Sequence, residues 1–257
     1  MKTRRMVLGL LAVAGVLSVL ITPLGGARAA DTVRIGTEGA YPPFNFIDES
    51  GQVKGFDVDI AKALCDQMKV QCDVVTQDWD GIIPALLAKK FDLIAASMSI
   101  TDERKQSVAF SDRYYSNLVR YVASKGTPLD ISEAGLTGKT IGAQRATVAA
   151  TYLDDKLGKT VKVKLYDTQE NANLDLVNGR VDGLLADGLV MFEWLKTKDG
   201  ENFQFYGDGL NLDDGIGIAV RKEDNALREK LNAAIKAIRE DGTYAKINAR
   251  YFPFSIY

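Results

Sequence analysis

Two stretches decide how this chain is expected to fold: Phe91-Asp92-Leu93-Ile94-Ala95-Ala96-Ser97 and Val181-Asp182-Gly183-Leu184-Leu185-Ala186-Asp187. In each, an aspartate opens a short apolar run typical of a buried strand, and a polar residue follows five positions later. Ligands of open α/β sheets bind beyond the carboxyl ends of the strands. We therefore expect Ser97 and Asp187 to face a ligand from two lobes that enclose a cleft. The alternative is two unrelated buried strands.

The sequence around these stretches alternates between predicted strands and helices. Apolar residues recur at helical spacing from Phe56 to Met68, and Asp57 is placed to cap that helix. The segment 225–239 is strongly amphipathic, and Gly242 ends it. Strands separated by helices of this length predict an α/β fold with mostly parallel sheets flanked by helices. The other predicted strands are 33–37, 70–76, 91–96, 140–143, 161–165 and 181–186, and the other predicted helices are 80–90, 169–178 and one from Thr147.

The N-terminus has the features of a secretory signal peptide. Lys2, Arg4 and Arg5 precede a continuous apolar run over 6–20, and the small residues of Ala27-Arg28-Ala29 follow. This pattern predicts a signal peptide over residues 1–29, cleaved near Ala29 or Ala30, and export to a bacterial periplasm. Whether export uses the general or the twin-arginine route is left open.

The composition of the predicted mature chain limits its partners. Cleavage removes four basic residues and leaves 28 Lys and Arg against 34 Asp and Glu, a net charge of −6. This balance argues against nucleic acid or an anionic membrane surface as the main partner. The remaining length allows one large domain or two lobes with separate cores.

Cys65 and Cys72 are seven residues apart in the mature part. In an exported chain this spacing favours a local disulfide, and two buried free thiols are the alternative. A metal site is not expected, because the chain has no histidine and no further cysteine. We expect no cofactor.

The sequence lacks several of the residues and motifs on which enzymes commonly rely. Without histidine, the commonest general base is missing and Ser–His–Asp or Cys–His catalysis is impossible. No glycine pattern typical of phosphate or dinucleotide binding follows a predicted strand.

The sequence contains more of the features expected of a ligand-binding protein. The run Ser97-Met98-Ser99-Ile100-Thr101-Asp102-Glu103-Arg104 leads from a strand end into a helix start, capped by Thr101 or Asp102. Two hydroxyls, backbone N–H groups and the Arg104 guanidinium would converge there, as an α-carboxylate requires. A surface salt bridge is the alternative role for Arg104.

Several motifs together resemble bacterial extracellular solute-binding proteins of family 3, the receptors of polar amino-acid ABC importers. They are the run 97–104, Gly55-Phe56-Asp57-Val58-Asp59-Ile60-Ala61, Trp79-Asp80-Gly81-Ile82-Ile83-Pro84-Ala85-Leu86, Phe110-Ser111, and the ending from Asp241-Gly242-Thr243-Tyr244 through Tyr251-Phe252. The members that bind lysine, arginine and ornithine, histidine, or opines are the most similar, and they also carry a short-loop disulfide.

The resemblance implies a two-lobed periplasmic-binding-protein fold of type II. Lobe 1 would comprise residues 31–118 and be completed by 215–257, and lobe 2 would comprise 119–214. The lobes would be joined by a two-segment hinge near 117–121 and 213–216.

The resemblance also implies roles for individual residues. Arg104 and the Ser99 hydroxyl would take the ligand carboxylate, while Ser97 and Asp187 would take the α-ammonium. The remaining ligand-binding residues would be Met98 between the two serines, the loop residues Gln144, Ala146 and Thr147, the aromatic pair Tyr41 and Trp79, and Glu38 at the far end of the ligand. Ala146 stands where the family usually has glycine.

Glu38 decides the expected specificity. A carboxylate in a closed pocket is costly unless a cation pairs with it, so we expect arginine, lysine or ornithine as the ligand. Opines such as octopine or nopaline, and polar neutral amino acids, are the alternatives. An exported enzyme resembling cyclohexadienyl dehydratases, which share this scaffold, is the alternative of another class. The receptor would be a monomer that docks transiently on a membrane permease.

Overall fold

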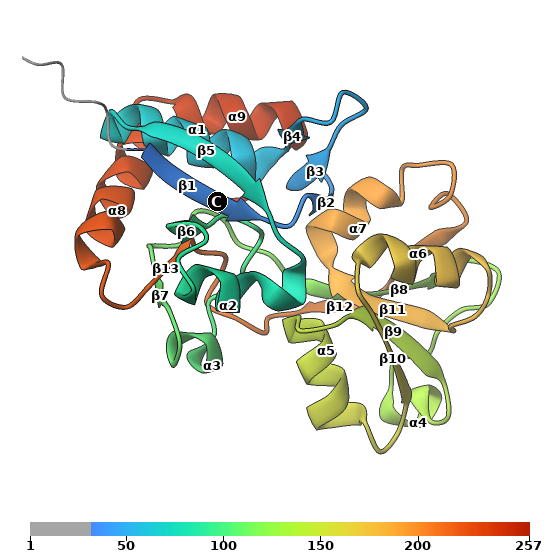
Figure 1. The fold of residues 1–257 in the computed structure, drawn as a ribbon. Coiled ribbons are helices and arrows are strands. Elements are labelled where there is room, and N and C mark those ends of the chain that lie inside the picture. The colour runs from blue at the N-terminus through green and yellow to red at the C-terminus, as the bar shows by residue number, and fades with distance from the viewer. Residues whose placement is uncertain (1–31) are drawn as a thin grey trace, which may run out of the picture.

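The structure, a computed structural model, describes residues 32–257 and contains two units, each built around a five-stranded sheet (Figure 1). We call the unit around the first sheet lobe 1 and the unit around the second sheet lobe 2. The predicted signal peptide and its cleavage site lie outside the described residues. Within 32–257, no helix is long and apolar enough to cross a membrane.

The two sheets have equivalent strand orders. The first runs β5 (Gln71–Thr76), β1 (Thr32–Thr37), β6 (Leu93–Ile94), β13 (Ala219–Val220), β7 (Ala109–Phe110). The second runs β10 (Lys162–Tyr166), β9 (Thr140–Gln144), β11 (Gly183–Asp187), β8 (Val119–Ser124), β12 (Phe203–Leu210). In each sheet, the first three strands are parallel to one another. The fourth strand is antiparallel to the third, and the fifth is antiparallel to the fourth. A small antiparallel sheet, β2 (Ala40–Tyr41), β3 (Asn45–Ile47) and β4 (Val53–Lys54), completes lobe 1.

Helices cover both faces of each sheet (Figure 1). In lobe 1, α1 (Phe56–Met68), α8 (Asn225–Glu240) and α9 (Thr243–Tyr251) pack on one face, and α2 (Ile82–Leu87) packs on the other. In β6, Leu93 belongs to the first of these cores and Ile94 to the second, as the alternation of a strand requires. Lobe 2 has α5 (Val148–Tyr152), extended by a π-helical turn (Leu153–Leu157), on one face and α6 (Gln169–Val177) with α7 (Gly188–Trp194) on the other. The short helices α3 (Asp102–Lys105) and α4 (Glu133–Leu136) lie in connections.

The two similar stretches 91–97 and 181–187 adopt the same local structure, one in each lobe. Asp92 donates its N–H to the Arg34 carbonyl (2.8 Å) and accepts from the Arg34 N–H (3.0 Å). Asp182 does the same with Thr140, at 2.8 Å in both directions. Each aspartate therefore fixes the start of the central strand of its sheet, β6 or β11, against the neighbouring parallel strand, β1 or β9. The strand ends carrying Ser97 and Asp187 are equivalent for this reason.

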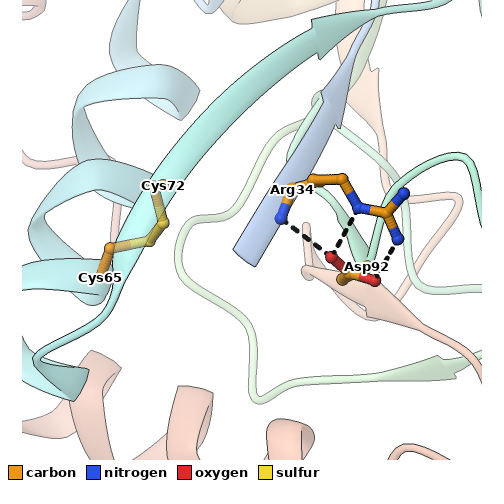
Figure 2. The surroundings of a disulfide bond; sticks show 4 residues. All are labelled: Arg34, Cys65, Cys72 and Asp92. Carbon is orange, nitrogen blue, oxygen red and sulfur yellow. Dashed lines mark hydrogen bonds and ion pairs between the residues drawn. A yellow bond between two sulfur atoms is a disulfide. The ribbon is translucent and has the colours of Figure 1, made fainter. Parts of the chain in front are cut away.

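The disulfide prediction is confirmed. Cys65 in the last turn of α1 is bonded to Cys72 in β5, with Cα atoms 6.3 Å apart. Figure 2 shows this bond near β1, where the Arg34 guanidinium forms two hydrogen bonds with Asp92, one of which is also an ion pair. The bond joins the helix end to the edge strand of the sheet.

Three local predictions differ from the structure. Asp57 does not cap its helix: the N-cap is Gly55, whose φ of 125° and close approach to the Phe44 carbonyl exclude a Cβ. The predicted helix over 80–90 is a 3-10 turn (Trp79–Gly81) followed by the short α2, which ends at Leu87 because Lys89 adopts a left-handed conformation (φ 61°). The strand predicted over 91–96 is reduced to the two residues of β6.

Two segments connect the sheets: residues 111–118, between β7 and β8, and residues 211–218, between β12 and β13. They lie together, since Ile216 forms isolated bridges with both Ser99 and Tyr115. The lobe limits at 118/119 and 214/215 and the hinge itself stay predictions.

Candidate functional site

A small pocket lies where the two lobes face each other, with about 280 Å³ of space not filled by atoms. All predicted ligand-binding residues except Met98 and Ala146 line it, and Ala96 and Val148 join them. Its lining is Glu38, Tyr41, Trp79, Ala96, Ser97, Ser99, Arg104, Gln144, Thr147, Val148 and Asp187. Residues from both lobes therefore meet in one place, as the strand-end argument requires.

Hydrogen bonds across the pocket hold the lobes together. The Gln144 side chain donates to Glu38 at 2.7 Å. The Trp79 indole N–H and the Arg104 Nη2 both donate to the Ala146 carbonyl, at 3.2 and 2.9 Å. The cleft is thus closed in this structure.

Arg104 enters the pocket from α3. The Thr101 side chain caps this helix and accepts from the Arg104 N–H at 3.2 Å. The guanidinium donates from Nη1 to the Ser99 carbonyl (2.9 Å) and lies 5.3 Å from the centre of the Trp79 ring. Burial lowers its pKa, whereas nearby carboxylates, Asp187 first, oppose that change.

No ion pair within residues 32–257 involves Arg104. A surface salt bridge is therefore not its role in the described chain. A guanidinium has five N–H donors in a planar fork. With two of its hydrogen bonds going to carbonyl groups, Arg104 keeps donors for a carboxylate.

Ser97 lines the pocket, whereas the neighbouring Met98 lies in the hydrophobic core. Ser97 is buried at the pocket wall with a left-handed backbone (φ 50°), and its hydroxyl accepts from Tyr115 at 2.6 Å. The Met98 side chain is fully buried in the α2 core, and its carbonyl accepts from the Gly217 N–H. The structure does not place Met98 in the pocket lining.

Asp187 ends β11 directly before α7. Burial raises the pKa of its carboxyl to about 6, while hydrogen bonds with Tyr41 and Asn117 and the charge of Arg104 act in the opposite direction. A buried carboxylate with a raised pKa gains from a cation beside it. Asp187 therefore suits an ammonium group.

The loop from β9 into α5 closes the pocket from lobe 2. Thr147 caps α5 by accepting from the Ala150 N–H (3.2 Å), and its hydroxyl donates to the Gln144 carbonyl (2.8 Å). Ala146 has a left-handed backbone (φ 56°), a conformation that glycine adopts more easily. Its side chain is outside the pocket lining, but its carbonyl receives the two hydrogen bonds from lobe 1.

Glu38 and the two aromatic residues complete the site. Tyr41 and Trp79 are both buried. Burial raises the pKa of the Glu38 carboxyl to about 7, the hydrogen bond from Gln144 opposes the rise, and the charge of Asp78 adds to it. Glu38 therefore lies in the pocket rather than pointing to solvent.

Sequence reasoning missed three polar residues that support the pocket. Asp57 is fully buried beneath Ser97. Asp213, on the second connecting segment, interacts with Ser99 and affects the charge balance there, and Asn117, on the first, interacts with Asp187. Each acts on a pocket residue that is distant in sequence, so no local pattern could have revealed it.

A larger hollow, with about 1410 Å³ of space not filled by atoms, lies at the connecting segments, next to Asn117 and Asp213. Two of its charged side chains already have partners: Asp214 pairs with Lys105 (2.8 Å), and Arg120 donates to the Gly207 carbonyl (2.9 Å). The smaller pocket is the better candidate site, because it is more enclosed and its polar groups converge.

Two α/β lobes joined by two segments, with an enclosed polar pocket between them, define a protein of the solute-binding class. The chain belongs to the bacterial extracellular solute-binding proteins, family 3, which it matches over residues 33–254. This result confirms the family and the type II fold predicted from the motifs.

Known relatives agree with this placement. The chain is 45% identical to the L-arginine-binding protein of Pseudomonas aeruginosa, over 96% of this chain and 98% of the relative. It resembles the structure of an ancestral arginine-binding protein bound to arginine, with a TM-score of 0.82, 37% identity, and coverage of 88% of this chain and 100% of the other. It also resembles an ancestral amino acid-binding protein described as a precursor of cyclohexadienyl dehydratase, with a TM-score of 0.77, 33% identity, and coverage of 86% and 95%.

Proposed function

We propose that this chain is the periplasmic receptor of an amino-acid ABC importer and that it captures a basic amino acid between its lobes without chemical change. The observation that carries the proposal is the presence of one basic and two acidic side chains in one closed pocket: Arg104, Asp187 and Glu38. Arginine, lysine and ornithine also carry three charges, one negative and two positive. Each charge of the ligand then has a partner of opposite sign.

The two ends of the ligand would be held from different lobes. Arg104 of lobe 1 takes the carboxylate, and Asp187 of lobe 2 pairs with the α-ammonium. Charge-assisted hydrogen bonds contribute about 1.5–3 kcal/mol each, so several together offset desolvation and closure. Because the set is complete only in the closed cleft, the ligand stabilises closure.

The aromatic residues favour a long cationic side chain. Tyr41 and Trp79 both line the pocket, and packing of an aromatic ring against an aliphatic stem or a guanidinium contributes about 0.5–2 kcal/mol. Glu38 then meets the distal cation. That cation would compensate the burial that raises the pKa of Glu38 to about 7.

The alternative ligands fit this charge pattern less well. A polar neutral amino acid leaves Glu38 without a cation, and an opine brings a second carboxylate into a pocket already rich in carboxylates. The relative from Pseudomonas aeruginosa supports arginine as the first ligand to test.

Catalysis is not part of the proposal. Asp187 stands where the ammonium partner is expected, and a dehydratase would need a catalytic acid or base in that position. The dehydratase precursor is itself described as amino acid-binding. We further propose that the protein acts as a monomer and that its closed form docks on the membrane permease.

The proposal predicts a specific ligand profile. In a thermal-shift panel of the twenty amino acids, ornithine and opines, arginine, lysine or ornithine should raise the melting temperature most, because a ligand that binds only the folded form stabilises it. In Glu38→Gln, the shift should fall for basic ligands and change little for glutamine.

The matched control is Glu49→Gln, a charge removal on an exposed residue outside the pocket. It should behave as the wild type. A wild-type panel led by neutral amino acids, or equal losses for arginine and glutamine in Glu38→Gln, would refute the basic specificity.

A further inference from the structure

Asp57, in the first turn of α1, is a fully buried carboxylate outside the pocket lining. Within residues 32–257, none of the ion pairs involves it. A buried carboxylate of this kind is costly unless hydrogen bonds satisfy it. Hydrogen-bond donors from three other segments of lobe 1 meet at the Asp57 carboxylate. These donors satisfy the carboxylate and hold it in place.

Asp57 holds Ser97 through two contacts. Its Oδ2 accepts from the Ser97 N–H at 2.8 Å and from the Ser97 hydroxyl at 3.2 Å. Ser97 has a left-handed backbone (φ 50°), which residues with a Cβ adopt only where the surroundings enforce it. The two hydrogen bonds to Asp57 are part of what enforces it.

These contacts also fix the polarity that Ser97 presents to the pocket. A hydroxyl has one O–H donor and two acceptor lone pairs. The donor goes to Asp57, and one lone pair receives the Tyr115 hydroxyl at 2.6 Å. The remaining lone pair can only accept a hydrogen bond, so Ser97 is prepared for a group that donates, such as an ammonium.

The same carboxylate reaches the loop that carries Glu38. Asn45 donates its side-chain N–H to Asp57 Oδ2 (3.2 Å), and its side-chain oxygen accepts from the Gly39 N–H (2.8 Å). The Tyr114 hydroxyl donates to the other oxygen, Oδ1, at 2.6 Å. Asp57 is therefore the junction between the end of the β6 segment and the loop after β1.

We propose that Asp57 is the positioning residue of the ammonium subsite: it holds the Ser97 backbone and turns the Ser97 hydroxyl so that only acceptor positions face the ligand. The inference rests on the proposed function, since it assigns Ser97 to the α-ammonium of an amino acid. It assigns to Asp57 a role in ligand selection that acts through Ser97 rather than by contact.

The test compares arginine with 5-guanidinopentanoate, which is arginine without its α-ammonium, by calorimetric titration. The wild type should prefer arginine strongly. In Asp57→Asn, which keeps the shape but loses the charge and one acceptor, the ratio of the two affinities should fall by about tenfold or more, the value of one charge-assisted hydrogen bond. Binding of the analogue itself should change by less than about threefold, within the range of an indirect effect.

The matched control is Asp59→Asn, which removes a carboxylate on the same helix that instead accepts from Tyr251 at 2.6 Å. It should keep the wild-type ratio. An unchanged ratio in Asp57→Asn, or equal losses for both ligands, overturns the inference, because a general structural role would weaken both.

A second variant covers the case in which Asp57→Asn does not fold. Ser97→Ala removes the oriented hydroxyl at the pocket wall, and the ratio should fall there too; an unchanged ratio overturns the inference. The wild-type titration separates this result from the proposed function. If the wild type binds no basic amino acid, the proposed function fails. If it binds arginine and the Asp57 and Ser97 variants keep its ratio, only the inference fails.

Discussion

Replacing Arg104 by alanine should abolish detectable amino-acid binding while the protein stays folded. The guanidinium is already held by the carbonyl groups of Ser99 and Ala146, so its free donors are preorganised for a carboxylate. Removing one partner of a buried, hydrogen-bonded charge pair costs about 2–5 kcal/mol, or roughly 30- to 5,000-fold in affinity. Calorimetric titration with arginine measures this loss, and a cooperative thermal melt shows that the variant is folded.

The control for this variant is Arg250→Ala. Arg250 lies on α9, is exposed, and pairs with Asp59 at 3.2 Å, outside the pocket. Its removal changes the net charge by the same amount and should leave the affinity unchanged. An Arg104→Ala protein that binds arginine as tightly as the wild type would show that the carboxylate is bound elsewhere.

Asp187→Asn is expected to weaken binding by more than tenfold, a loss of about 1.4 kcal/mol or greater. The change keeps the shape of the side chain and removes the negative charge that would pair with the α-ammonium. Titration with arginine again measures the effect. Asp208→Asn is the matched control, since Asp208 is exposed on β12 of lobe 2 and lies outside the pocket lining.

The pH dependence gives this variant a second signature. Burial raises the pKa of Asp187 to about 6 in the ligand-free protein, and an ammonium partner lowers it again. Below pH 6 the carboxyl is protonated and must release its proton on binding, so wild-type affinity falls as the pH falls. In Asp187→Asn the curve should be flatter below pH 6, leaving the fall due to Glu38, whose pKa is about 7. A loss smaller than tenfold, with an unchanged pH curve, would place the ammonium elsewhere.

Much of the fold was predictable because its signals are local. The apolar stripe of α8 buries Leu231, Ile235 and Ile238, as its spacing predicts. The sequence similarity between 91–97 and 181–187 reflects a shared hydrogen-bonding pattern, in which Asp92 and Asp182 fix equivalent strands. Composition and these patterns therefore predict the α/β class and the paired strand ends. The family was predicted from its resemblance to known motifs.

The rest could not be predicted because it depends on contacts between distant residues. The position of Asp57 predicts a helix cap, the usual role of an aspartate near a helix start. Its actual partners, Ser97 and Tyr114, are 40 and 57 residues away. Met98 shows the same limit: it lies between two pocket serines, but the alternation of side chains turns it into the core. The role of each pocket residue in binding stays a prediction.

The most direct test of the central claim, that the pocket recognises three charges at once, is a calorimetric titration of the mature protein with arginine and three analogues that each lack one charge. Agmatine lacks the carboxylate, 5-guanidinopentanoate lacks the α-ammonium, and norvaline lacks the guanidinium. Arginine should bind, and each analogue should bind at least about tenfold more weakly, since every missing charge leaves a buried partner uncompensated. Binding of norvaline or agmatine as tightly as arginine would contradict the account.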